Sequence, residues 1–139
     1  MTYDPSNIFA KILRGEIPAH KVYEDDAALV MMDIFPQSRG HTLVIPKAES
    51  RNLLDADPKT ISNIMPLVQR VAKALQATTN ADGIRFAQFN EEAAGQTVFH
   101  LHFHLIPAYQ DTALGAHASG SRADDAELAT LAKEIAARL

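Results

Sequence analysis

Apolar side chains recur along the chain at two spacings, and the spacing separates predicted helices from predicted strands. A spacing of three and four residues predicts a short helix that Ser6 can cap and that ends at Gly15. The same spacing follows Pro58 and predicts the longest helix, with Pro66 expected to kink it or to move its start. A third helical pattern covers residues 128–139 and predicts a C-terminal amphipathic helix.

Five shorter apolar segments, bounded by turn residues, predict strands. They are residues 20–23, 28–34, 41–45, 84–89 and 98–106. Most of the connections are short, and the long helix lies between the third and fourth strands. We therefore expect one α+β domain over residues 1–139, with an antiparallel sheet of about five strands, one long helix, a short N-terminal helix and a C-terminal helix. Its core spans about residues 6–110, and 111–139 form an extension in which 113–122, rich in Gly, Ala and Ser, are expected to be mobile.

The composition is that of an ordinary globular domain. The 139 residues are 47% hydrophobic and 22% charged. A net charge of -4 gives no basic surplus for a nucleic-acid backbone, although a small nucleotide needs only a local polar pocket. The lack of cysteine excludes disulfides, thiol nucleophiles and cysteine-held zinc. With charges early in the sequence and no apolar run near the roughly 20 residues of a membrane span, we expect a cytoplasmic protein without a secretory signal.

The most informative segment is residues 95–107, in which His100, His102 and His104 alternate with apolar residues. Side chains alternate faces along a strand, so the three imidazoles are expected on one face at spacings of about 6.6 Å. The apolar residues between them are then expected in the core. A wet strand face would explain a single histidine. Three in alternation indicate chemistry, because Thr, Lys or Glu would keep a face wet equally well.

Two kinds of chemistry compete for these imidazoles. In the first they bind a metal, but three ligands in line converge poorly, because the outer pair is about 13 Å apart on a straight strand. In the second, one imidazole attacks phosphorus while its neighbours orient it and bind phosphate oxygens. The loop before the strand favours the second, since Gly95 permits close backbone approach and Gln96 and Thr97 offer polar groups. A simple turn into a strand is the alternative interpretation of that loop.

These residues match a known family. HLHFHLI at 100–106 resembles the signature of the histidine triad (HIT) family, His-x-His-x-His followed by apolar residues. The N-terminal half is similar to the Hint branch, the histidine triad nucleotide-binding proteins. The matching segments are IFAKI at 8–12, IPA at 17–19, YEDD at 23–26, MDIFPQ at 32–37 and GHTLVIPK at 40–47. The resemblance spans about residues 6–109.

The resemblance implies an α+β homodimer whose sheets join across the interface. It implies binding of purine nucleoside monophosphates and hydrolysis of nucleoside phosphoramidates and related adducts. In the family's pattern, His102 attacks the α-phosphorus and carries a transient nucleotidyl group, and His100 helps to position it. His104 and His41 lie near the phosphate. We expect no cofactor, no metal ion, no nucleic-acid polymer and no membrane as partners.

The resemblance also assigns residues that hold the nucleotide. Asp33 matches the acidic residue that accepts bonds from the ribose hydroxyls, although alone it would be a solvated strand-end carboxylate. Asn90 matches an asparagine near the phosphate and the 5′ oxygen. The loop that holds phosphate and leaving group corresponds to Gln96, Thr97 and Val98. The apolar lining of the base pocket corresponds to Ile8, Phe9, Ile12, Ile17, Met31 and Ile34, which are otherwise simply core.

The sequence departs from the family's pattern at two points, and it leaves several functions open. The chain lacks the Cys pair with which some histidine triad proteins hold zinc, and the tail from 111 to 139 does not match the short tails expected for the branch. His20 and His117 have no motif support and are interpreted as structural. The alternatives to a phosphoramidate hydrolase are a dinucleoside polyphosphate hydrolase, a nucleotide-binding adaptor with vestigial activity, and a metal hydrolase.

Overall fold

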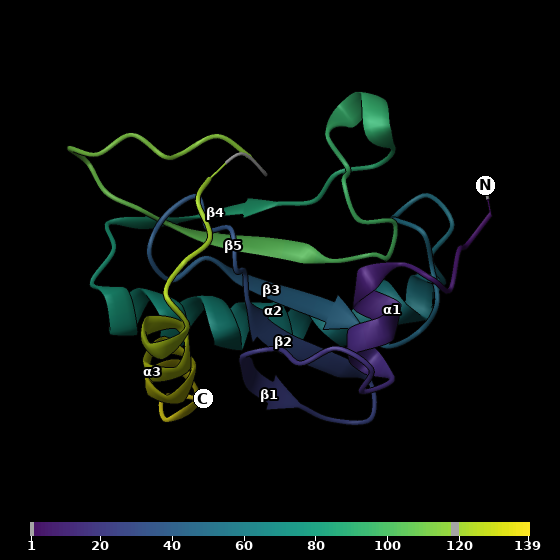
Figure 1. The fold of residues 1–139 in the computed structure, drawn as a ribbon, viewed down its shortest axis with the longest axis horizontal. Coiled ribbons are helices and arrows are strands. Elements are labelled where there is room, and N and C mark those ends of the chain that lie inside the picture. The colour runs from purple at the N-terminus through teal and green to yellow at the C-terminus, as the bar shows by residue number, and fades with distance from the viewer. Residues whose placement is uncertain (1, 118–119) are drawn as a thin grey trace.

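The chain forms an open five-stranded antiparallel sheet in the computed structural model, which describes residues 2–117 and 120–139 (Figure 1). The strands are β1 (Lys21–Glu24), β2 (Ala28–Met32), β3 (Thr42–Pro46), β4 (Gly83–Ala87) and β5 (Phe103–Ala108). Their order in the sheet is β1-β2-β3-β5-β4, and each neighbouring pair is antiparallel. The α+β class and the five-stranded sheet predicted from the sequence are confirmed.

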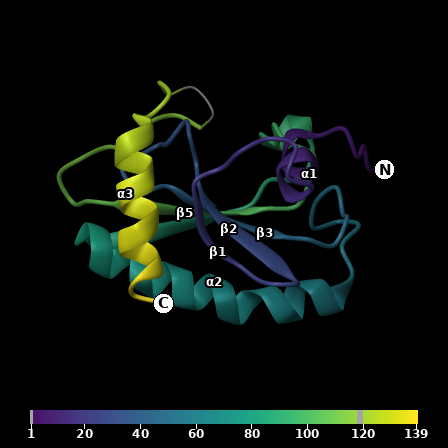
Figure 2. The same ribbon diagram turned by 60° about the horizontal axis from the view of Figure 1, so that its bottom comes forward.

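Three α-helices pack around the sheet. They are α1 (Ile8–Leu13), α2 (Pro58–Thr79) and α3 (Asp125–Ala136), and a short 3-10 helix spans Glu92–Ala94. Figure 2 shows α2 running along the sheet with α3 crossing it. Side chains cap both longer helices, because Asp57 accepts from the N–H of Lys59 and Asp124 accepts from that of Glu127.

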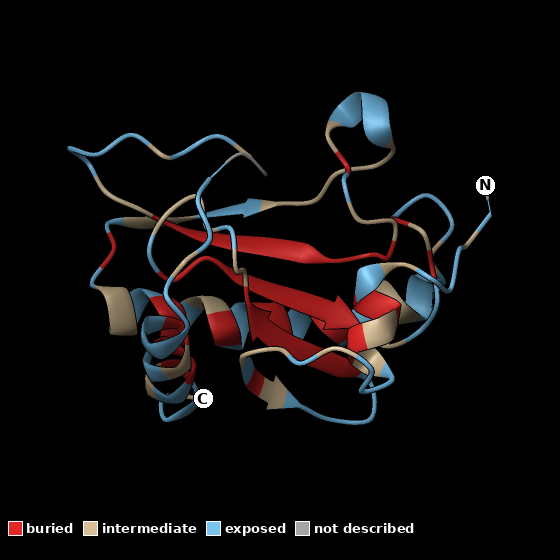
Figure 3. Cartoon of the chain, in the orientation of Figure 1, coloured by how far each residue is buried: buried red, intermediate tan, exposed pale blue. Residues whose placement is uncertain are grey.

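Alternation along the central strands divides the core between the two faces of the sheet. Val30, Val44 and Phe103 belong to the larger cluster, which α2 and α3 cover. Leu29 and Leu43 belong to a smaller cluster on the other face, together with apolar side chains of α1. The central strands are buried, whereas the edge strand β4 is largely accessible (Figure 3). Phe9 of α1 packs against His102, so the histidine segment lies on the face that carries α1.

The later helix start predicted at Pro66 is wrong, because α2 begins at Pro58 and continues through Pro66 to Thr79, whereas the alternative, a kink, stays a prediction. A proline inside a helix removes one N–H donor and leaves one carbonyl of the preceding turn free. Pro66 lies on the exposed side of α2, where water can satisfy that carbonyl. The buried side of the helix is therefore uninterrupted.

The predicted strand over residues 98–106 is also wrong at its start, because β5 begins at Phe103. Only His104 of the three histidines lies in the strand, while His100 and His102 precede it. In the register that pairs Val44 with Phe103, Leu101 would face Pro46, which has no N–H to donate. The carbonyl of Pro46 instead accepts a hydrogen bond from the ring of His100. The sheet ladder therefore ends where the histidine contacts begin.

The remaining boundaries differ from the predictions by a few residues. The tail prediction for 113–122 falls partly on residues 118 and 119, which lie outside the described residues. On either side of them the backbone is bonded to the β2–β3 loop, by Gly115 N–H to Gln37 O at 2.9 Å and by Ala123 N–H to Ile34 O at 2.9 Å. No helix in the described part of the chain is both long and apolar enough to span a membrane.

Candidate active site

A cavity of about 230 Å³ opens on the sheet face that carries α1. Its walls come from α1, the end of β2 and the loop after it, the β4–β5 loop and the histidine segment. All six predicted base-pocket residues line it, namely Ile8, Phe9, Ile12, Ile17, Met31 and Ile34. Asp33, Thr97, Val98, His102 and His104 also line it. The cavity is therefore an apolar slot with a polar end.

His102 is held in one tautomer by the backbone. Its Nδ1–H donates to the carbonyl oxygen of His100 at 2.7 Å, so the lone pair of the ring is on Nε2. The ring is 8% exposed and packs edge-on against Phe9, with ring centroids 4.8 Å apart. Burial lowers the pKa of His102 to about 4, so the ring is neutral at pH 7. A neutral imidazole with a directed lone pair is a nucleophile.

His100 is fully buried and lies behind His102 rather than in the cavity wall. Its Nε2–H donates to the carbonyl oxygen of Pro46 at 2.7 Å, and its Nδ1 accepts from the hydroxyl of Tyr3 at 2.6 Å. Both ring nitrogens are thus occupied, and burial lowers the pKa of this ring. Because its side chain is fixed at both ends, its carbonyl is fixed as the acceptor for His102.

His41 and His104 form a directed pair. The backbone N–H of Gln37 donates to His41 Nδ1 at 3.0 Å, so His41 carries its hydrogen on Nε2 and donates it to His104 Nδ1 at 2.9 Å. His104 must then carry its own hydrogen on Nε2, which is buried and has no hydrogen-bond partner among the described residues. Burial holds the pKa of both rings well below the usual range. An unpaired buried donor in a cavity wall is a site for an acceptor.

Asp33 stands at the end of β2, beside this pair. Its Oδ1 accepts from the N–H of Phe35 at 2.8 Å, and its Oδ2 lies 3.4 Å from His41 Nε2. Burial raises the pKa of Asp33 to about 6, so the carboxylate is mostly charged at pH 7. It is available at the polar end of the cavity to accept from hydroxyl groups.

Asp33, His41 and His104 also place ligand atoms within 4.8 Å of one another, the spacing of a metal site. A metal on His41 Nε2 would need that nitrogen without its hydrogen. The Gln37 N–H occupies Nδ1 as a donor, so the hydrogen of the neutral ring must be on Nε2. The hydrogen bonds therefore disfavour a metal here, and its absence stays a prediction.

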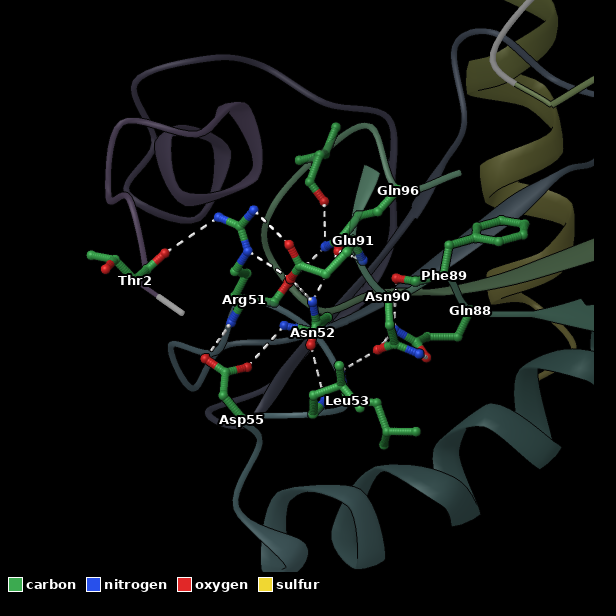
Figure 4. Close-up of polar contacts among 12 residues, drawn as sticks. Thr2, Arg51, Asn52, Leu53, Asp55, Gln88, Phe89, Asn90, Glu91 and Gln96 are labelled. Carbon is green, nitrogen blue, oxygen red and sulfur yellow. Dashed lines mark hydrogen bonds and ion pairs between the residues drawn. The ribbon is translucent and has the colours of Figure 1, made fainter. Parts of the chain in front are cut away.

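Gln96 and Asn90 are not among the residues that line the cavity, and their roles at the phosphate stay predictions. The amide oxygen of Gln96 accepts from Glu91 N–H at 2.8 Å and from Asn52 at 3.0 Å. Its amide nitrogen donates to Arg51 O at 2.7 Å. The Asn90 side chain accepts from Leu53 N–H at 2.9 Å. Figure 4 shows these contacts joining the β3–α2 loop to the β4–β5 loop.

Arg51 and Glu91 complete this junction. Two guanidinium nitrogens of Arg51 donate to the two carboxylate oxygens of Glu91 at 2.8 and 2.9 Å, and Asn52 donates to the same carboxylate at 2.6 Å. Glu91 has a φ of 77°, a left-handed conformation that is strained for a residue with a side chain. The side-chain contacts hold this conformation, and with it the start of the loop that carries Thr97 and Val98.

Sequence reasoning missed three groups at the site. Tyr3 lies in a segment without a periodic pattern, and Arg51 and Glu91 are 40 positions apart with no motif between them. His117 was interpreted as structural, yet it lines the cavity beside His104. The only sequence signal for it is an imidazole in a segment otherwise rich in small residues.

Comparisons with known proteins give a family model, sequence relatives and solved structures of the same fold. The family model described as HIT domain matches residues 14–111. The adenosine 5'-monophosphoramidase HNT1 of Saccharomyces cerevisiae is 35% identical over 139 residues, which cover 99% of this chain and 85% of that protein. The adenylylsulfatase HINT3 of Arabidopsis thaliana is 38% identical over 112 residues, covering 81% and 57%. The crystal structure of a Hit-like protein from Bartonella henselae is 50% identical, with a TM-score of 0.92 and coverage of 99% and 100%.

Proposed function

The chain belongs to the HIT domain family, and from this membership and the site geometry we propose that it hydrolyses purine nucleoside phosphoramidates or related adducts of a nucleoside monophosphate. The coarser description is a nucleotide hydrolase of that family. The finer proposal names a covalent intermediate in which His102 carries the nucleotidyl group. One observation carries it, the 2.7 Å hydrogen bond that directs the lone pair of His102 to Nε2.

In the first step Nε2 of His102 attacks the α-phosphorus. The Nε2–P bond forms as the bond between phosphorus and the leaving nitrogen breaks, and that nitrogen takes up a proton from solvent to leave as an amine. The phosphorylated ring is cationic, and the carbonyl of His100 stabilises it through the Nδ1–H bond. In the second step water attacks phosphorus and the Nε2–P bond breaks. The water proton is released, and the neutral imidazole is regenerated.

His104 and His41 supply a fixed donor for the phosphate. The unpaired Nε2–H of His104 is available to a phosphate oxygen, and His41 keeps the hydrogen on that side of the ring. A preorganised donor of this kind stabilises the charge that develops in displacement, and removing one costs about 10²- to 10³-fold in rate. Thr97 and Val98 also line the cavity.

The rest of the cavity suits a nucleoside. An apolar slot accepts a purine ring, and the Asp33 carboxylate accepts from both hydroxyls of a ribose. The two named relatives act on adenylyl compounds according to their names, a monophosphoramidate and an adenylyl sulfate. These substrates differ in the leaving group, so we place the common part, the nucleoside monophosphate, in this cavity.

A homodimer stays a prediction. The edge strand β4 is paired on one side only, and Phe86 on it is 48% exposed. A free edge of this kind is where a second copy could extend the sheet.

The test of the proposal is the His102→Ala variant. We expect it to bind adenosine monophosphate with near wild-type affinity, to keep the native circular dichroism spectrum, and to lose turnover of an adenosine phosphoramidate. Rapid-quench mass spectrometry of the wild type should place a transient nucleotidyl group on His102. Full activity in the variant would refute the mechanism.

Two further outcomes would select the other functions. Faster turnover of a diadenosine polyphosphate than of the phosphoramidate would favour a dinucleoside polyphosphate hydrolase. Tight binding by the wild type without turnover of either compound would favour a nucleotide-binding adaptor.

A further inference from the structure

The chain that follows β5 returns past the loop between β2 and β3 before it reaches α3 (Figure 1). Besides its hydrogen bond to Gln37 O, Gly115 packs so closely that an added Cβ would lie 3.2 Å from that oxygen. Beyond residues 118 and 119, Ala123 N–H is bonded to Ile34 O at 2.9 Å. Both contacts are to the loop that begins with Asp33, so the backbone on this side of the site is held at two points.

This crossing brings His117 to the cavity. Its Nε2–H donates to the carbonyl oxygen of Gly95 at 3.0 Å, which leaves the lone pair on Nδ1. The ring packs on Phe89 with centroids 4.5 Å apart, and edge-on against His104 at 5.2 Å. His117 therefore stands next to the ring of His104, on the side of the β4–β5 loop.

The described residues that line the cavity include few charged groups that could bind a phosphate. No lysine or arginine is among the described residues that line the cavity, and its one carboxylate is Asp33. His102 and His104 are kept neutral by burial, which lowers the pKa of each. His20 also lines the cavity, but its Nε2 is already hydrogen-bonded to Asp125 at 2.9 Å. A bound phosphate would bring negative charge into a site without a built-in cation, and His117 is the remaining imidazole.

We propose that His117 is a phosphate-binding residue of this site, with Nδ1 directed at an oxygen of the nucleotide phosphate and Nε2 held by Gly95. Both nitrogens of a protonated imidazole donate, so in that form Nδ1 can donate to a phosphate oxygen while Nε2 keeps its bond to Gly95. This inference rests on the proposed function, because it requires a nucleotide in the cavity. It means that the segment after β5 contributes a substrate-binding residue.

Calorimetric titration with two ligands tests the inference. Adenosine monophosphate and adenosine share the base and the ribose and differ in the phosphate. We expect His117→Ala to weaken binding of adenosine monophosphate by about 10- to 100-fold, the range for a hydrogen bond to a charged group, and to change adenosine binding by less than about twofold. His117→Phe keeps a ring against Phe89 and His104 and is expected to show the same selective loss.

Asp111→Ala is the matched control, because it removes an exposed charge from the same segment outside the cavity. It is expected to bind both ligands as the wild type does. Equal losses for the two ligands in the His117 variants, or no loss in either, would overturn the inference. A wild-type protein that does not bind adenosine monophosphate at all would instead refute the proposed function.

Discussion

We expect acid to destabilise the protein through His102, and the size of the effect follows from the burial of its ring. Burial lowers the pKa of His102 from an ordinary value of 6.5 to about 4. At about 1.4 kcal/mol for each pKa unit, this corresponds to about 3 kcal/mol in the free energy of unfolding. The His102→Asn variant removes the titrating group while keeping a side-chain N–H that can donate to the carbonyl of His100.

The direction follows from proton binding in the two states. As the pH falls below 6.5 the unfolded chain takes up a proton on His102, whereas the folded protein does so only near pH 4. The unfolded state binds more protons across this window, so the stabilisation is complete above pH 6.5 and is lost as the pH falls to about 4. Asp33 acts in the opposite sense, since its pKa is raised to about 6, but it is common to wild type and variant and cancels in their difference.

Urea unfolding of both proteins at half-unit steps from pH 8.5 to 4 measures the effect. We expect the two free energies of unfolding to run parallel above about pH 7. Below that, the wild type should lose about 2 to 3 kcal/mol more than His102→Asn. Parallel curves over the whole range, or a variant that is more sensitive to acid, would show that the buried ring is not held neutral by the fold.

Two further predictions concern the support of the site. Tyr3→Phe removes the hydroxyl that donates to His100. We expect steady-state kinetics to show kcat lower by about tenfold with KM nearly unchanged. An equal loss of affinity for adenosine monophosphate would contradict a positioning role. Gly40→Ala introduces a Cβ at a φ of 96° and 2.8 Å from a methyl group of Thr79, so urea unfolding is expected to show a loss of about 3 kcal/mol. Gly83→Ala has open space at its Cβ and is the control, with an expected change within about 1 kcal/mol.

Periodicity located the sheet and the helices because burial of apolar surface fixes them locally. The apolar runs predicted as β2 and β3 are buried throughout, and alternate side chains along them divide between the two core clusters. The extent of β5 was not predictable in this way, because its ladder stops at a proline on another strand. The start of α2 was misplaced at Pro66 because the cost of a proline inside a helix depends on whether the freed carbonyl reaches water, which the local sequence does not show.

The site was predictable where the motif names the residue and unpredictable where a distant contact decides its role. The cavity wall contains His102, His104 and Asp33 as the sequence indicates. The side chain of Gln96 points instead into a network built from the β3–α2 loop, 44 positions earlier in the chain at Asn52. No spacing rule relates such partners, because the fold, not the local sequence, brings them together.

The hydrogen bond from Gln37 to His41 has a consequence for how the pocket responds to its surroundings. A peptide N–H does not ionise in the physiological range. The main chain therefore fixes the donor-to-acceptor direction of the hydrogen bonds from Gln37 to His41 and from His41 to His104. Solvent acidity cannot reverse this direction while burial keeps both rings neutral. A displacement of the turn between β2 and β3 would remove the Gln37 hydrogen bond and free both rings to change tautomer. The conformation of that turn therefore determines whether His104 presents an N–H to an incoming anion.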